Sequence, residues 1–216
     1  MSETIASYWR FLLAGVLRRG QTGALVPSQR FLTTKMIAPV PRSYRGLLLE
    51  LGPGTGALTL RLAARCPAAH ILACEINPVL AEDLKRRVTS AGRTRQVEVI
   101  EAPAQEVLAS LAKSGQQLGF ILSGIPLGNL RRERVMDLLD GIAGALADGG
   151  MYIQFQYSLM DRKKIRSRFA NLHTVPVWLN IPPAVVYYAR KLPQPALSSY
   201  QLPLTRPVFF DHRHRA

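Results

Sequence analysis

Acidic residues and cysteines are both scarce in this chain of 216 residues. It has 14 aspartates and glutamates against 28 lysines and arginines, so its formal net charge is +14. A charge of this size favours a polyanionic partner, either nucleic acid or the anionic face of a membrane. The two cysteines, Cys66 and Cys74, are too few for a disulfide framework, and we interpret them as reduced core residues of a cytoplasmic protein.

Long uninterrupted hydrophobic runs are lacking as well. The stretch 171–189 has no charged residue, but it contains Pro176, Pro182 and Pro183 and is rich in valine and tyrosine, which favours two strands around a turn over a membrane span. The apolar run 11–17 ends in two arginines without a small-residue cleavage site, so we expect a protein that is not exported. The 48% of hydrophobic residues suffices for the core of one domain.

The segment 46–60 organises the chain. Its apolar run 47–49 has no helical periodicity and ends at an acid, Glu50, which predicts a buried parallel strand. Glycines then alternate with other residues before an apolar helical pattern begins, so a tight turn should lead into a helix. The three glycines of this turn are Gly52, Gly54 and Gly56.

The spacing E-x-G-x-G-x-G indicates which cofactor this turn binds. Dinucleotide sites use G-x-G-x-x-G and place a pyrophosphate at the helix N-terminus. Glu50 would repel a pyrophosphate but suits a ligand with an ammonium or sulfonium group, such as S-adenosylmethionine. Glu75, at the end of the next apolar run, stands where this fold binds a ribose diol. We therefore predict an S-adenosylmethionine site; for the glycines alone, an ordinary strand–helix turn is the alternative.

Strand and helix patterns alternate from residue 47 onward. Such alternation predicts an α/β fold with a mostly parallel sheet, helices on both faces and the ligand beyond the strand carboxyl ends. The last two strands have no helical run between them and should pair antiparallel. The expected strands are 47–51, 70–75, 96–100, 118–123, 150–157, 172–180 and 184–190, and the expected helices are 56–65, 78–91, 104–113, 130–147 and 161–170.

Residues 1–20 have the pattern of an amphipathic helix. Large apolar residues recur at i, i+3, i+4 and i+7, and most bases lie opposite. Two interpretations stay open: a helix packed on its own domain, or an interfacial helix in an anionic lipid surface, where apolar burial would outweigh the attraction of the arginines. The candidate membrane-binding residues are Ile5, Tyr8, Trp9, Arg10, Leu12, Leu13, Val16, Arg18 and Arg19.

The segments that flank the alternating region have their own signals. Residues 21–45 are predicted to be a lid, in which Gly23 and Pro27 break the structure and Ser28 caps a short helix beginning near Gln29. Residues 46–190 would form the cofactor-binding domain. Residues 191–216, with four prolines and several bases, are expected to be a poorly ordered tail or a surface strap.

Four motifs together resemble class I S-adenosylmethionine-dependent methyltransferases. They are Glu50-Leu-Gly-Pro-Gly-Thr-Gly56, Glu75-Ile-Asn77, Glu101-Ala102 and Ser123-Gly-Ile-Pro-Leu127. With the N-terminal helix and Asn180-Ile-Pro-Pro-Ala184, the pattern is similar to bacterial phospholipid N-methyltransferases, which convert phosphatidylethanolamine to phosphatidylcholine. The segment Ser28-Gln-Arg-Phe-Leu32 is similar to ribosomal RNA adenine dimethylases instead.

The fourth motif favours the lipid enzymes. Adenine methylases carry Asn or Asp, then Pro, then an aromatic, because the flipped base must stack and its amine must be hydrogen-bonded. Ser123 and Leu127 stand at those places here, and only 26 residues follow Arg190, where RNA enzymes add a helical domain. The resemblance thus implies stepwise methylation of phosphatidylethanolamine. RNA adenine dimethylation and a non-catalytic, membrane-binding basic domain are the alternatives.

The resemblance also implies a fold and a set of site residues. The fold is a Rossmann-like seven-stranded sheet, mostly parallel, with an antiparallel last strand. S-adenosylhomocysteine would be the product, and the protein would lie on the inner face of the cytoplasmic membrane, without a metal or a nucleic-acid partner. The implied cofactor contacts are Ser28, Glu50, Gly52, Gly54, Gly56, Glu75, Ile76, Glu101, Ala102 and Ser123.

No residue is an obvious general base for the acceptor amine. The Ser123 hydroxyl and the carbonyls around Gly124 and Ile125 are candidates to orient the nitrogen, and Tyr157 is a further catalytic candidate. An aromatic surround would suit a methylated cation, although plain core packing is the alternative for each aromatic. The candidates for this surround are Tyr8, Trp9, Tyr157, Trp178 and Tyr187, whereas His173 is interpreted as structural.

Overall fold

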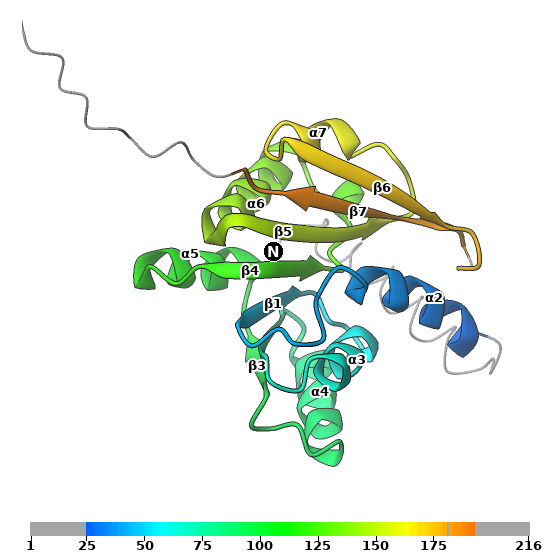
Figure 1. The fold of residues 1–216 in the computed structure, drawn as a ribbon, viewed down its shortest axis with the longest axis vertical. Helices are drawn as coiled ribbons and strands as arrows, with labels where there is room; N and C mark the ends of the chain where they lie inside the picture. Colours follow the sequence, from blue (N-terminus) through cyan, green and yellow to red (C-terminus); the bar gives the residue numbers. More distant parts are fainter. Residues whose placement is uncertain (1–24, 181, 193–216) are drawn as a thin grey trace, which may run out of the picture.

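The structure, a computed structural model, describes residues 25–180 and 182–192. Within these ranges the chain forms one seven-stranded sheet with helices on both faces (Figure 1). The predicted N-terminal helix, all nine candidate membrane-binding residues and the tail 193–216 lie outside the described residues.

The strand order is β3-β2-β1-β4-β5-β7-β6, and every neighbouring pair from β3 to β5 is parallel. Strand β7 is antiparallel to both of its neighbours, β5 and β6, which confirms the predicted sheet with its antiparallel last strand. The strands are β1 (Leu47–Leu51), β2 (His70–Glu75), β3 (Val97–Glu101), β4 (Leu118–Ser123), β5 (Leu146–Gln156), β6 (Asn171–Val177) and β7 (Ala184–Arg190).

The helices divide between the two faces of the sheet. Side chains alternate along a strand, so in β1 Leu48 packs into the core shared with α2, α3 and α4, whereas Leu49 and Leu51 pack against α5, α6 and α7. The helices are α2 (Leu25–Ile37), α3 (Ala57–Arg65), α4 (Pro78–Ser90), α5 (Ala104–Ser114), α6 (Arg132–Ala145) and α7 (Arg162–Arg166), with a 3₁₀ turn η1 (Leu127–Asn129).

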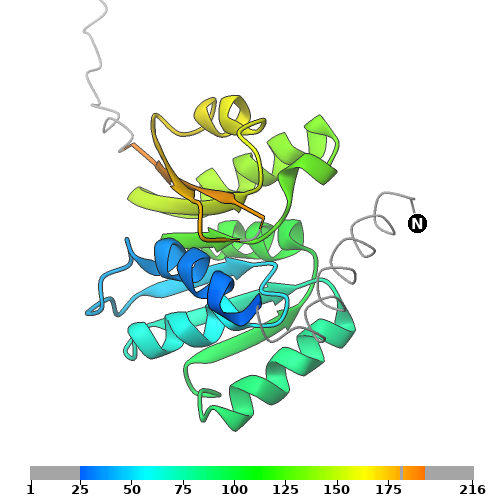
Figure 2. The ribbon, with the colours of Figure 1, turned by 90° about the vertical axis from the view of Figure 1, so that its right-hand side faces the viewer.

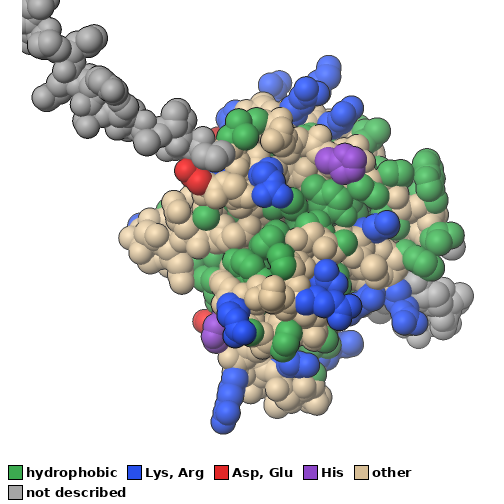
Figure 3. All heavy atoms as spheres, viewed as in Figure 1, with side chains coloured by type: hydrophobic (Ala, Val, Ile, Leu, Met, Phe, Trp, Pro, Cys, Tyr) green, Lys and Arg blue, Asp and Glu red, His purple; other side chains and the backbone are tan. Residues whose placement is uncertain are grey.

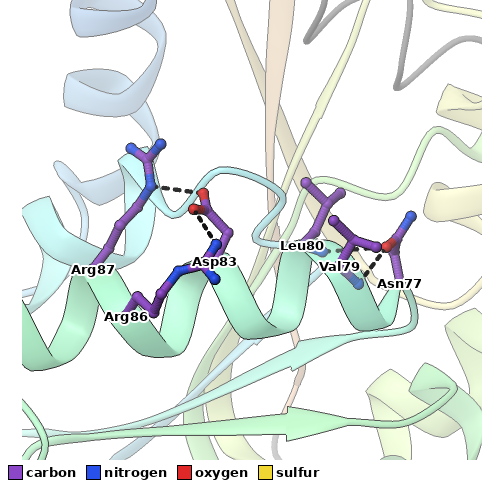
Figure 4. Close-up of polar contacts among 6 residues, drawn as sticks. All are labelled: Asn77, Val79, Leu80, Asp83, Arg86 and Arg87. Atoms are coloured by element: carbon purple, nitrogen blue, oxygen red, sulfur yellow. Dashed lines mark hydrogen bonds and ion pairs between the residues drawn. The ribbon is translucent and has the colours of Figure 1, made fainter.

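Helix α4 shows how local chemistry sets a helix start beside the carboxyl edge of the sheet. Asn77 caps the helix, because its Oδ1 accepts hydrogen bonds from the backbone N–H groups of Val79 at 2.8 Å and Leu80 at 3.2 Å (Figure 4). Pro78 occupies the first helical position, where no N–H is needed. One turn later Asp83 pairs with two exposed arginines, which adds little stability (Figure 4). The cap therefore fixes the chain two residues after β2 ends.

Helix α2 begins earlier than predicted. It starts at Leu25, so Ser28 lies inside the helix and its predicted role as the cap of a helix near Gln29 is wrong. Pro27 is tolerated because it stands in the first turn, where backbone N–H groups have no intrahelical acceptor. Farther along, Met36 is buried against the sheet.

Three other boundaries differ from the expected ones by three residues or more. Strand β5 begins at Leu146, directly after α6, because Leu146 pairs with Leu118 before the register shifts. Helix α7 is limited to Arg162–Arg166, and β6 ends at Val177. No helix in the described part of the chain is both long and apolar enough to cross a bilayer.

Candidate functional site

The glycine loop between β1 and α3 has a backbone that only glycine adopts easily. Gly52, Gly54 and Gly56 have φ values of 69°, 57° and 77°. A Cβ atom on Gly52 would approach Ile125 Cγ1 to 3.2 Å, whereas one on Gly54 would meet no described atom within 4 Å. Gly52 therefore faces the loop that follows β4, and Gly54 faces open space at the carboxyl edge.

Glu75 joins the glycine loop to the end of β2. Its Oε2 accepts a hydrogen bond from the Gly54 N–H at 3.0 Å, and its Oε1 accepts one from the Asn77 N–H at 3.0 Å. The side chain is 1% exposed, and burial raises the pKa of its carboxyl group, although these backbone hydrogen bonds oppose the shift. Two motifs that are 21 residues apart in sequence thus meet through one carboxylate.

Glu50 lies on the neighbouring strand and is the least satisfied polar group of the site. Its Oε2 and the Thr59 Oγ1 are both buried without a hydrogen-bond partner of normal geometry among the described residues. Burial raises the pKa of Glu50 to about 7; the Thr59 hydroxyl lowers it in part, and the charge of Glu75 raises it further. A buried carboxylate oxygen without a donor is stabilised by a cationic ligand, so the site fits an ammonium or sulfonium group.

The third motif, Glu101-Ala102, lies at the end of β3, which pairs with β2 on the side away from β1. The Ala102 N–H donates to the Glu75 carbonyl oxygen at 3.2 Å, and Glu101 is exposed. Ile76 is also exposed, with 43% of its surface accessible. The predicted cofactor residues from β1, β2 and β3 therefore line one continuous stretch of the carboxyl edge, which Figure 2 views from that side of the molecule. The side chain of Ser28 lies outside the described part.

Two glutamines of β5 fix the position of the loop after β4. The Ile125 carbonyl oxygen accepts hydrogen bonds from Gln154 Nε2 at 3.0 Å and from Gln156 Nε2 at 3.2 Å. The Gly124 N–H donates to the Leu51 carbonyl oxygen at 2.8 Å, which ties this loop to β1. No described residue donates a hydrogen bond to the carbonyl oxygen of Gly124.

This geometry distinguishes the predicted acceptor groups. Ser123 is wholly buried, and its Oγ accepts a hydrogen bond from the Ile125 N–H at 3.2 Å, so its hydroxyl helps to fix the position of the loop. The Ile125 carbonyl is already engaged by two amide groups. Of the three predicted groups, only the Gly124 carbonyl oxygen accepts no hydrogen bond from a described residue and is not wholly buried with its residue.

Gln154 and Gln156 support the site, although they are not among the residues predicted from the sequence. They alternate with apolar residues in a central strand, and Tyr152 precedes them on the same face, donating a hydrogen bond to Gln154 Oε1. Polar side chains at every second position of a buried strand are a signal, because buried polar groups need partners.

The candidate aromatics lie in different surroundings. Tyr157 is half-buried and packs edge-on against Phe155, with ring centroids 5.7 Å apart. Tyr187 is buried and donates a hydrogen bond to the Ser158 carbonyl at 2.8 Å, as a packed core tyrosine does, whereas Trp178 is 75% exposed. His173 stacks on Tyr188 along β6 and β7. Tyr8 and Trp9 fall outside the described residues.

No group of three or more His, Cys, Asp or Glu side chains in the described ranges is arranged to hold a metal ion. Cys66 and Cys74 are both buried and free, in agreement with their interpretation as core residues. Burial raises the pKa of the Cys74 thiol to about 12, so this thiol stays protonated.

A family model described as "Methyltransferase domain" matches residues 48–150. The ornithine lipid N-methyltransferase of Singulisphaera acidiphila is 26% identical over 170 residues, which cover 77% of this chain and 87% of that protein. A probable dimethyladenosine transferase of Drosophila melanogaster is 29% identical over 86 residues, but these cover 40% of this chain and 28% of that protein.

Solved structures share the fold at low identity. The structure described as StiE O-MT has a TM-score of 0.65 and 16% identity, covering 82% of this chain and 80% of that one. An O-methyltransferase family protein of Burkholderia thailandensis has a TM-score of 0.63 and 11% identity, covering 77% and 57%. These matches establish a Rossmann-like α/β fold, and the matched methyltransferase domain implies use of S-adenosylmethionine.

Proposed function

Because the chain is a class I S-adenosylmethionine-dependent methyltransferase, we propose that its acceptor is the amine of a membrane lipid, with phosphatidylethanolamine as the first candidate headgroup. The mono-, di- and trimethylated lipids would be its products. A lipid N-methyltransferase is similar over most of its length, whereas the similarity to a dimethyladenosine transferase is confined to a short part of that protein.

The main support for this proposal comes from the loop after β4, residues 124–127, which we call the acceptor loop because it would bind the methyl acceptor. Leu127, which stands where adenine methylases need an aromatic ring, is wholly buried, and Ser123 beside it is buried as well. Neither side chain can stack on a flipped base or hydrogen-bond its amine. A small alkylamine needs only one hydrogen-bond acceptor and a dry wall, and the Gly124 carbonyl and the half-buried Ile125 side chain supply these.

The cofactor residues are proposed in three groups. Glu50 would face the positively charged methionine end, and Glu75 would accept hydrogen bonds from the ribose hydroxyls. Gly52, Gly54 and Gly56 would let the backbone approach the ligand. The remaining contacts would come from Ile76, Glu101 and Ala102, which follow the strands next to β1.

S-adenosylmethionine supplies a methyl group bonded to a positively charged sulfur. The chain's own contribution would be to orient and desolvate the amine. The Gly124 carbonyl would accept a hydrogen bond from the amine. This hydrogen bond would orient the lone pair of the amine nitrogen toward the methyl carbon, while Gln154 and Gln156 keep the loop in place. The amine proton would leave to water, since none of the described residues at this loop is an obvious base.

Membrane delivery is proposed for the N-terminal segment. Residues 1–20 would dock on the anionic inner leaflet of the cytoplasmic membrane, 21–45 would connect docking to the cofactor domain 46–190, and 191–216 would be a tail. Deletion of residues 2–19 should reduce both vesicle binding and turnover on lipid. If both are retained, this helix only packs on the domain.

A methyl-transfer assay with labelled S-adenosylmethionine tests the acceptor. Purified protein is given phosphatidylethanolamine vesicles, ornithine lipid vesicles or unmodified ribosomal RNA. We expect label in methylated phosphatidylethanolamine and none in RNA. Label in ornithine lipid alone would replace phosphatidylethanolamine as the proposed headgroup, but the proposal of a lipid acceptor would stand. Label in adenine would support the alternative hypothesis, RNA adenine dimethylation. Cofactor binding without any methyl transfer would favour a non-catalytic membrane-binding domain.

A further inference from the structure

Two chain segments leave the sheet side by side at its carboxyl edge. Val185 of β7 pairs with Gln156 of β5 on one side and with Pro176 of β6 on the other. Strands β5 and β6 therefore run in the same direction and end at the same level, about 10 Å apart, since adjacent strands are ~4.8 Å apart. This is the edge where β1 and β4 end, so the segment after β5 leaves the sheet beside the loop that follows β4, and the segment after β6 leaves the same edge two strands farther along (Figure 1).

Both segments expose large apolar side chains. After β5, Leu159 is 53% and Met160 is 83% exposed; after β6, Trp178 is 75% and Leu179 is 63% exposed. We call these four residues the apolar rim. Single exposed apolar residues are ordinary, but two adjacent pairs at one edge of the sheet indicate a contact surface.

Unpaired positive charge follows directly in the chain. Arg162, Lys163 and Arg166 of α7 are exposed, and none forms an ion pair with an acidic residue in the described ranges. The acid that precedes them, Asp161, is buried and already paired with Lys164 at 2.7 Å. Figure 3 shows Lys and Arg side chains gathered over α7, with hydrophobic side chains along the flank that carries the β6–β7 turn.

We propose that the apolar rim and these three bases form a membrane-docking surface within the folded domain, separate from the N-terminal segment. Its partner would be a bilayer that contains anionic lipids. Tryptophan, leucine and methionine side chains would insert at the headgroup level while the bases contact lipid phosphates. This inference rests on the proposed function, because docking at this edge would bring a lipid amine to the Gly124 carbonyl.

A single-stranded nucleic acid fits this surface less well. Such ligands are bound by rows of aromatic side chains on which bases stack, and three of the four rim residues are aliphatic. A lipid surface has no such requirement, since it accepts any exposed apolar side chain beside positive charge.

The test uses the full chain and vesicles of phosphatidylethanolamine with phosphatidylglycerol. The variant Met160→Glu/Leu179→Glu is compared with Leu192→Glu, because Leu192 is 50% exposed but follows β7 at the opposite edge of the sheet. We expect the rim variant to bind vesicles at least about tenfold more weakly and the control to bind normally. Lys163→Ala/Arg166→Ala should weaken binding mainly at low salt.

Three further measurements separate failure of docking from failure of the proposed function. Calorimetry with S-adenosylmethionine should give the same affinity for the rim variant and wild type, which shows that the domain is folded. Turnover on a short-chain, water-soluble phosphatidylethanolamine should also be unchanged, whereas turnover on vesicles should fall. Binding of RNA in the absence of vesicles should be weak and equal in both proteins.

Other outcomes overturn the inference. Equal vesicle binding by the rim variant and wild type would show that the rim is not a docking surface. Loss of turnover on the short-chain lipid would place the rim in the acceptor pocket, and selective loss of RNA binding would make the partner a nucleic acid. If wild type methylates no lipid amine, the proposed function fails, while vesicle binding still decides whether the rim docks.

Discussion

The two ends of the carboxyl edge are held by different kinds of contact. At the cofactor end, backbone N–H groups of Gly54 and Asn77 bind the Glu75 carboxylate. At the acceptor end, the side-chain amides of Gln154 and Gln156 bind the Ile125 carbonyl oxygen. Both ends join a side chain to the backbone, but the cofactor loop also needs three glycines at positive φ and therefore tolerates little change. The acceptor loop depends instead on two glutamines that can be altered one at a time.

This difference suits the tasks proposed for the two ends. The cofactor is the same molecule in every enzyme of this class, so its site can be rigid. The acceptor differs between enzymes, and a loop whose position depends on a few side chains can be adapted to a new acceptor without disturbing the cofactor site. Substitutions at the two ends should therefore separate cofactor affinity from turnover.

The largest effect is expected at the cofactor end, from Gly54→Val. The valine side chain would occupy the open space into which Gly54 faces, and S-adenosylmethionine affinity should fall by about a hundredfold or more because the ligand would clash. Gly92→Val is the matched control, since Gly92 has a similar φ of 66° with nothing near its Cβ position, on the loop after α4. Thermal unfolding of both variants measures the shared backbone strain, and calorimetry measures the affinity. Equal affinities would remove Gly54 from the site.

A smaller loss of affinity is expected for Glu75→Ala. Each charge-assisted hydrogen bond to a ribose hydroxyl contributes ~1.5–3 kcal/mol, so binding should weaken by roughly ten- to a hundredfold. Glu98→Ala is the control, because Glu98 is an exposed acid on β3 away from the glycine loop. Calorimetry measures the affinity, and an unchanged value would exclude Glu75 from ribose binding.

At the acceptor end, Gln154→Ala and Gln156→Ala should change turnover and leave cofactor affinity intact. Each removes one donor from the Ile125 carbonyl, so the loop should lose its fixed position and kcat should fall about tenfold. Because both donors share one acceptor, the double variant should lose less than the product of the single effects. Steady-state kinetics with saturating lipid, together with calorimetry, gives both quantities. A matching loss of cofactor affinity would show that the two ends are not independent.

The same contrast explains what the sequence predicted and what it did not. Glycines at fixed spacing and acids at strand ends are local signals, so the glycine turn and the mostly parallel sheet could be predicted, and Glu50 and Glu75 could be named as cofactor candidates. The Gln154 and Gln156 contacts with Ile125 join residues about 30 positions apart, and a sequence pattern does not show which carbonyl a buried amide meets. Pro27 predicts a break before the helix, but α2 already begins at Leu25, because a proline fits the first turn of a helix.

The smallest expected effect belongs to Glu50, which lies on β1 between the two ends. Its pKa of about 7 is raised in the free protein by burial, so the group gains its negative charge only as pH rises through 7. A cationic ligand binds the charged form, and S-adenosylmethionine affinity should therefore increase about threefold between pH 6.5 and pH 7.5. Stability should change in the opposite direction: a raised carboxyl pKa means that the folded state binds more protons than the unfolded state. The contribution of Glu50 to stability therefore falls as pH rises from about 4.5 to 7.

The variant Glu50→Gln removes this titration, so the pH dependences of both affinity and stability should flatten. Calorimetry and thermal unfolding across this pH range measure them. An affinity that is independent of pH in the wild type would mean that Glu50 does not face the positive charge of the cofactor, and the cofactor end would then depend on Glu75 and the glycine loop alone.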